Sequence, residues 1–352
     1  MAILGAGKGG DSGLPNVMFS ATTTWTPSCT IEAMVYCIGG GGSGGYSNRN
    51  TDASASGGGA GGTAVSKYVF LASTAYTITI GAGGASPGQI TAAAAGTGNA
   101  GGATTIAVGG STFMTGGAGG AGATGSGAGC SGGAGGTSSG GNISNLTGGA
   151  GGACASTRQV SGGGSTALWM TGSAGQAGIT GASTSSVVEH SFGGALNQYQ
   201  EVGVYATIEK GSMDNQGSGQ SQDIPVMLAP FPELFSYDEQ QQGPYNGWED
   251  ASPTVYADPT NKYHAGQIMN GGANNRFDSA SSRGNGYYVA QPTGPFEGGK
   301  GTVVADGHEW STGSRVSMGA GSGATRTTDS SGRCHSAKGG AGVVLIFPMS
   351  MG

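Results

Sequence analysis

The stretch GGAGGAGATGSGAGCSGGAGGTSSGGNISNLTGGAGG, residues 116–152, decides the fold. The block GGAGG occurs in it three times, at 116–120, 132–136 and 148–152, so that successive blocks begin 16 residues apart. A fourth copy lies at 58–62. A fixed spacing of this kind is an internal repeat, which we interpret first as a feature of the fold and not as a catalytic motif.

Glycine is the residue that lets extended chains approach one another closely. Because it has no Cβ, neighbouring left-handed helices with three residues per turn can touch and exchange backbone hydrogen bonds between chains. A repeat of this length can fold into two legs of about five or six residues joined by turns, which returns every block to the same level. The sequence therefore predicts a bundle ordered by backbone pairing. The alternative is a flexible linker of Gly, Ser and Ala.

The composition supports an unusual framework. The chain has 78 glycines in 352 residues, and only 9% of its residues are charged. From 39 to 181 there are 46 glycines, about the collagen fraction, but the strict G-X-Y period of collagen is missing. Between Asp52 and Glu189 the only charged residues are Lys67 and Arg158. A large apolar core cannot be what orders this region.

Strand patterns flank the glycine-rich zone. Residues 30–38 alternate, and this places Ile31, Ala33, Val35 and Cys37 on one face. Further strands are predicted at 66–71 and 75–80, the second with Tyr76, Ile78 and Ile80 in period two, and an apolar strand is predicted at 342–347. No segment between 30 and 185 has the pattern of an amphipathic helix. We therefore expect a mainly β fold.

Several function classes lack support in the sequence. The longest run of large apolar residues, 343–347, is far too short to span a membrane, and residues 1–10 do not form a secretory signal peptide. We expect synthesis in a cytoplasm, no membrane insertion and, at a net charge of -6, no nucleic-acid binding. The five cysteines lack metal-binding spacing and are expected to be free thiols.

The sequence contains no catalytic or cofactor-binding motif in the structural context that such a motif requires. Gly5, Gly7 and Gly10 match a dinucleotide-binding fingerprint, but no helical pattern follows them. The four histidines are scattered, and no serine lies in a nucleophile elbow. We expect no enzyme activity, no cofactor and no metal.

The segment 189–310 has a different composition. It contains 15 of the 19 acidic residues and eight of the 12 tyrosines, together with many turn signals. We interpret it as an acidic, aromatic, loop-rich insertion. Its aromatic rings either form platforms that bind a sugar or protein receptor, or pack as the core of the insertion itself. The candidate receptor-binding residues are Tyr245, Trp248, Tyr256, Tyr287, Tyr288 and Trp310.

The order of the motifs resembles that of the glycine-rich domains of bacteriophage tail-fibre and related virion proteins. Four features carry the resemblance: Trp25-Thr26-Pro27 leading into 31–38 and then 39–42, the 76–80 strand running into 81–84, the GGATT stretch at 101–105, and the closing 339–342 followed by 343–347. The resemblance implies a small β-sandwich whose loops expand into polyglycine-II packing, at the receptor-contacting or surface end of a fibre.

Together these observations predict four regions. They are an N-terminal attachment segment (1–24), a Gly-rich β/polyglycine-II domain (25–188), the insertion (189–310), and a return to the Gly-rich domain with its final strand (311–352).

The functional hypothesis is a non-enzymatic tail-fibre tip or adhesin on the virion surface, in a homo-oligomer for which a trimer is the expected form. Its expected partners are other virion proteins and a host glycan or outer-membrane protein. Alternatives are a capsid decoration or other structural virion protein, an ice-binding protein and a polysaccharide hydrolase.

Overall fold

The chain folds as a mainly β protein. The computed structural model describes residues 2–5, 16–48, 52–87, 90–91, 95–167, 172, 174, 179–180, 189–191, 287–289, 301–304, 310–312, 318–327, 333–335 and 338–351. Several of its sheets are antiparallel, and no helix occurs within these ranges. The expectation of a mainly β fold is thus confirmed.

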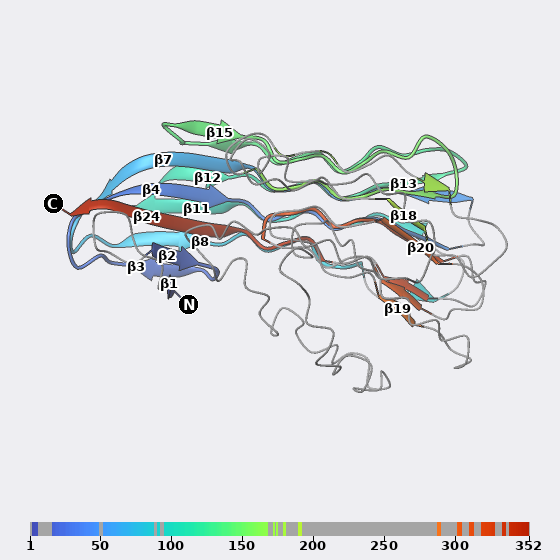
Figure 1. The fold of residues 1–352 in the computed structure, drawn as a ribbon, viewed down its shortest axis with the longest axis horizontal. Coiled ribbons are helices and arrows are strands. Elements are labelled where there is room, and N and C mark those ends of the chain that lie inside the picture. Colours follow the sequence, from blue (N-terminus) through green and yellow to red (C-terminus); the bar gives the residue numbers. More distant parts are fainter. Residues whose placement is uncertain are drawn as a thin grey trace, which may run out of the picture.

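Two antiparallel sheets lie at one end of the molecule, which we call the core end (Figure 1). The first has six strands in the order β1 (Ala2–Gly5), β2 (Asn16–Phe19), β24 (Val343–Met351), β4 (Ile31–Ile38), β7 (Thr63–Phe70) and β15 (Ser144–Leu146). The second has the order β14 (Ser138–Ser139), β12 (Ser111–Gly116), β11 (Thr104–Val108), β8 (Tyr76–Thr79) and β3 (Thr23–Trp25). Strands from both ends of the chain therefore belong to one sheet.

One hydrophobic core lies between these sheets. It combines Val35 and Phe70 of the first sheet with Tyr76 and Ile106 of the second, all almost completely buried. The Trp25 ring packs on Phe70 with its centroid at 5.0 Å. The predicted face of β4 is confirmed, because its odd-numbered residues from Ile31 to Cys37 are buried. The predicted strands agree with β4, β7, β8 and β24 to within a few residues at their ends.

Glycine-rich extended segments lead away from the core-end strands to small sheets at the opposite, distal end (Figure 1). We call these segments legs. Consecutive legs run out and back, so that β4 leads outward into leg 39–45, and leg 56–62 returns to β7. The described legs are 39–45, 56–62, 81–87, 97–103, 117–123, 131–137, 147–153, 161–167, 319–324 and 338–342.

The hydrogen bonds of leg 39–45 repeat with a period of three residues. The N–H groups of Gly39, Gly42 and Gly45 donate to carbonyls of leg 56–62 at 3.0, 2.8 and 2.9 Å. The intervening Gly40 and Ser43 donate to leg 97–103, and Gly41 donates to leg 338–342. Legs 56–62 and 97–103 thus receive every third residue, while Gly44 donates to Ser322 Oγ of leg 319–324 at 2.9 Å.

Leg 56–62 is surrounded by six other legs. It donates to legs 117–123, 147–153 and 319–324, and it accepts from legs 39–45, 131–137 and 161–167. All of its residues are buried. Its backbone groups therefore find partners in the neighbouring legs, as buried N–H and C=O groups require.

Close approach of the legs leaves no room for side chains at most of their positions. A Cβ on Gly59 would lie 2.0 Å from the Ala134 carbonyl oxygen, and one on Gly42 would lie 2.0 Å from that of Gly120. These neighbours are backbone atoms, which cannot swing aside as a flexible side chain can. Gly109, in the turn between β11 and β12, differs: its φ is +56°, and a Cβ there would meet nothing within 4 Å.

We expect Gly59→Ala to lower the free energy of unfolding by about 3 kcal/mol or more, because its methyl group would push two hydrogen-bonded legs apart. Gly109→Asn is the control, since asparagine tolerates a positive φ in a hairpin turn, and it should cost less than about 1 kcal/mol. Urea unfolding followed by tryptophan fluorescence measures both. Equal costs for the two variants would show that the legs do not pack closely.

Candidate functional site

The distal end consists of three small sheets built from the tips of the legs. The first has the order β10 (Ala95–Gly96), β5 (Tyr46–Asn48), β22 (Thr325–Thr327), β20 (Gly301–Val304) and β18 (Glu189–Ser191). The second has the order β13 (Thr124–Ser126), β6 (Ala53–Ala55), β16 (Gln159–Val160) and β17 (Ile179–Thr180). The third has the order β19 (Tyr287–Val289), β21 (Trp310–Thr312), β23 (Arg333–His335) and β9 (Ile90–Thr91).

The described strands of the acidic insertion all belong to these distal sheets. β18 and β20 pair antiparallel, with Glu189 opposite Val303 and Ser191 opposite Gly301. β18 and β20 are thus adjacent strands of the first distal sheet, and β19, which lies between them in the sequence, belongs to the third. These strands lie away from β1 and β24, which are at the core end (Figure 1).

Three of the six candidate receptor-binding residues fall on neighbouring distal strands. β19 and β21 pair in parallel, with Tyr287 opposite Trp310 and Tyr288 opposite Ser311. The sequence predicted these residues only as part of an aromatic insertion. In the structure, Tyr287 and Trp310 lie opposite each other on the paired strands. Tyr245, Trp248 and Tyr256 lie outside the described residues.

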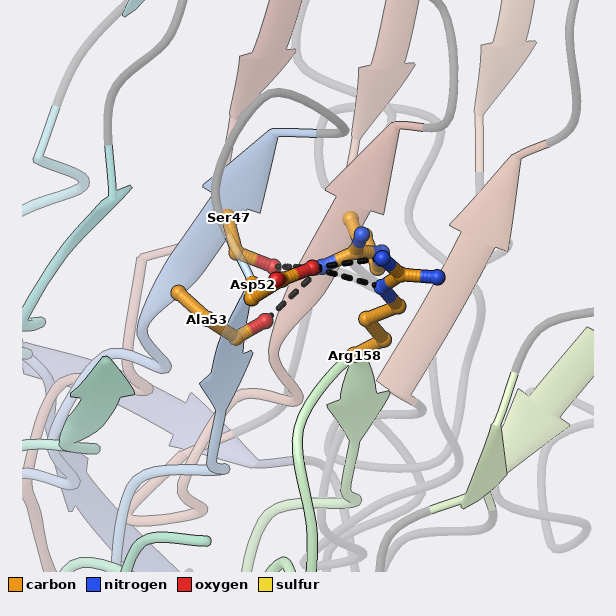
Figure 2. A network of polar contacts seen from close by, with 5 residues as sticks. Ser47, Asp52, Ala53 and Arg158 are labelled. Carbon is orange, nitrogen blue, oxygen red and sulfur yellow. Dashed lines mark hydrogen bonds and ion pairs between the residues drawn. The ribbon is translucent and has the colours of Figure 1, made fainter. Parts of the chain in front are cut away.

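A polar network holds the distal strands together (Figure 2). The Arg326 guanidinium from β22 is 3% exposed, and it donates to the Ala53 carbonyl at 2.7 Å and to Ser47 Oγ at 3.3 Å. Beside it, Arg158 donates to Asp52 Oδ1 through Nε at 2.8 Å and Nη2 at 2.6 Å. The Arg158 and Asp52 side chains are 60% and 64% exposed. A buried cation and an exposed ion pair thus lie close together.

Lys67 and Arg158 are the only charged residues between Asp52 and Glu189. Each of them forms an ion pair with an acidic residue. Arg158 pairs with Asp52 at the distal end, while Lys67 Nζ donates to Glu32 Oε1 at 2.9 Å on the core-end sheet. The hydrogen bond from Lys67 lowers the pKa of the exposed Glu32 carboxyl below its usual value. Apart from the exposed Lys338, the described legs carry no charged residue, so their packing rests on neutral groups.

Two features of the distal end went unrecognised in the sequence. Arg326 has no distinguishing neighbours in sequence and can be found only from its burial. Cys130 and Cys154 had a usable signal: Cys130 stands two residues before the block at 132–136, and Cys154 stands two residues after the block at 148–152. Legs that run out and back in register place such positions opposite each other.

The described residues offer few groups for chemistry. Within them, no cluster of three or more His, Cys, Asp or Glu residues could hold a metal ion. No helix in the described ranges is long and apolar enough to cross a membrane. What the distal end offers is paired strands and a polar network that fix the positions from which the insertion departs.

Comparison with known families agrees with this architecture. The model of the glycine-rich domain family matches residues 18–247, which is more than half of the chain, and the protein therefore belongs to this family. The match begins in β2 at the core end and extends into the insertion. No curated protein matches the sequence.

We expect Arg326→Met to lower the free energy of unfolding by about 2 kcal/mol or more, because it leaves the buried Ala53 carbonyl and Ser47 hydroxyl without this charged donor. Arg158→Met is the matched control: its ion pair with Asp52 is exposed to solvent, so its loss should cost less than about 1 kcal/mol. Equilibrium urea unfolding compares the two variants. A larger loss for Arg158→Met would contradict the assigned roles.

Proposed function

We propose that this protein is a non-enzymatic bacteriophage virion protein, a tail-fibre tip or receptor-binding adhesin, whose glycine-rich framework presents the insertion 189–310 to the host surface. One observation carries the proposal. β18 at the start of the insertion and β20 near its end pair with each other, at the end of the molecule opposite β1 and β24. An attachment end and a presentation end are thereby separated by the length of the legs.

In this proposal the core end is a β-sandwich, and the legs are polyglycine-II helices. The shared core of the two antiparallel sheets supports the sandwich. The polyglycine-II assignment is supported by the hydrogen bonds of leg 39–45, which return to the same neighbour every third residue, and by the six legs around leg 56–62. A left-handed helix of this type has three residues per turn and forms no hydrogen bonds within itself.

The framework suits presentation because its order does not depend on charge. Most hydrogen bonds of leg 56–62 with its six neighbours join backbone groups, and the side chains that take part, such as Ser161 Oγ accepting from Gly57 N–H at 3.0 Å, are neutral hydroxyls. Salt screens interactions between exposed charges, but it has little effect on buried neutral hydrogen bonds. A bundle of this kind holds the insertion at a fixed distance from the particle under varied ionic conditions.

The insertion would supply the contacts. Its aromatic residues offer flat rings that bury a large area at low entropic cost, as sugars and protein receptors require. Tyr287 and Trp310 occupy paired register positions on β19 and β21. Several copies on one particle, in a homotrimer attached to other virion proteins, would multiply weak contacts with a host glycan or outer-membrane protein.

The test is competition for adsorption. Purified full-length protein is added to bacterial strains, and the adsorption of phages that infect each strain is measured against protein concentration. The proposal predicts saturable binding to at least one strain and dose-dependent blocking of a phage that infects it. Saturating protein that binds no susceptible strain and blocks no phage would contradict it and favour a structural virion protein such as a capsid decoration.

Variants then locate the contact. Trp248→Ala and Tyr288→Ala should weaken cell binding by about 10-fold or more, as truncation of aromatic anchors does. Leu71→Ala, a half-exposed residue at the core end, should leave binding unchanged. Aromatic variants that unfold would place these rings in the core of the insertion. Release of reducing sugar from the cells by the wild-type protein would instead favour a hydrolase.

A further inference from the structure

Two cysteines far apart in the sequence face each other at the distal end. Cys130 and Cys154 form an isolated antiparallel bridge, in which the Cys130 N–H donates to the Cys154 carbonyl at 3.0 Å and the Cys154 N–H donates back at 2.8 Å. Both thiols are free, and their side chains contact each other through a hydrogen bond. Residues paired in this way have Cα atoms about 5.5 Å apart, within the range that a disulfide spans.

The surroundings of the two sulfur atoms differ. Cys130 is half-buried and lies among donors: Ser54 Oγ lies 3.3 Å from its sulfur. The hydrogen bond from the Cys154 thiol, followed by those from Ser54 and Ser56, lowers the pKa of Cys130 to about 6. The Cys154 thiol is buried, and its sulfur lies 3.2 Å from the Ala55 carbonyl oxygen, a second acceptor within reach of its single proton. Its hydrogen bond to Cys130 and its burial raise the Cys154 pKa above the ordinary thiol value.

The other described cysteines have no such pairing. Cys37 is buried in the core, where burial raises the pKa of its thiol to about 12. Cys29 is a half-buried free thiol that packs against the core. The side chain of Cys334 lies outside the described part of the structure. Cys29 therefore serves as an internal reference for the reactivity of a single accessible thiol.

The cysteine pair stands at the open end of a hairpin of two legs. Leg 131–137 runs toward the core end and leg 147–153 returns from it, joined there by β14 and β15. The legs are hydrogen bonded to each other, from Gly148 N–H to Gly136 O at 2.9 Å and from Gly151 N–H to Gly133 O at 2.8 Å. A bond between the cysteines would close this hairpin into a covalent ring at the distal end.

We propose that Cys130 and Cys154 are a redox-active dithiol that reacts with low-molecular-weight disulfides such as oxidised glutathione. The Cys130 thiolate attacks one sulfur of the small disulfide, forming a mixed disulfide and releasing one small thiolate, which takes up a proton. Cys154 then loses its proton and attacks the Cys130 sulfur, forming the Cys130–Cys154 bond and releasing the second small thiol. The two protein thiols are oxidised, and one small disulfide is reduced to two thiols.

The order of the two steps follows from the surroundings of the sulfur atoms. Cys130 is accessible and forms a thiolate more readily, so it reacts first. Once Cys130 is held in a mixed disulfide its negative charge is gone, and its contribution to the raised Cys154 pKa is gone with it, while that of burial remains. Cys154 is already in contact with the sulfur that it must attack. The product restrains the distal ends of these two legs.

The test uses the full-length protein, fully reduced and then treated with oxidised glutathione at neutral pH without oxygen. Thiol titration after denaturation should fall from five groups to three, with the intact mass lower by two hydrogen atoms. Trypsin cannot separate the pair, because no Lys or Arg lies between Lys67 and Arg158. Chymotryptic cleavage at Leu146 does separate them, and the two fragments should stay joined until a reductant is added.

Variants distinguish this pair from unspecific oxidation. Cys154→Ser should stop at a mixed disulfide on Cys130, Cys130→Ser should lose the cross-link, and Cys29→Ser should still form it. Oxidised wild-type protein should melt about 5 °C or more above reduced protein, because the ring restricts the unfolded chain. A cross-link that fails to form in wild-type protein, or glutathione that adds to Cys29 faster than to Cys130, would overturn the proposal. Neither result depends on the folding of a variant.

Discussion

The structure depends on one constraint: the backbone donors and acceptors of the legs must find partners in other legs, because an extended leg of this kind forms no hydrogen bonds within itself. Glycine makes this possible, since a Cβ on Gly42 or Gly59 would lie 2.0 Å from a neighbouring carbonyl oxygen. Where the bundle does contain a side chain it is small, and the serines use it for the same purpose. Ser56 Oγ donates to the Ser131 carbonyl at 2.7 Å and accepts from Ala123 N–H at 2.8 Å.

Three parts of the molecule are held together by different interactions. The core end relies on apolar packing between two sheets, with Phe70 buried in the core and Trp25 packed against it. The legs rely on neutral backbone hydrogen bonds. The described strands of the distal end have two to four residues, and the buried Arg326 joins three of them by binding Ala53 of β6 and Ser47 of β5 from its place on β22. The insertion departs from this last part, where the framework is fixed by specific polar contacts.

The sequence predicted the core end well, because a half-buried strand shows its period of two directly, as in the alternation from Ile31 to Cys37. The spacing of the GGAGG blocks also indicated legs that run out and back. The sequence could not show which legs are neighbours, since one GGAGG block offers the same backbone groups as another. The short distal strands have too few residues for a pattern. The pairing of Tyr287 with Trp310 and that of Cys130 with Cys154 therefore became visible only in the folded chain.

The order of the legs comes from their hydrogen bonds to one another. Amide hydrogen exchange measures this claim directly, because the backbone N–H groups of Gly42, Gly59 and Ser56 donate to other legs at 2.8 to 2.9 Å. We expect these amides to exchange as slowly as those of β4 in the core, because the legs and the core-end sheets unfold together as one cooperative unit. Exchange of the leg amides at the rate of an unfolded glycine-rich chain, while β4 stays protected, would contradict it.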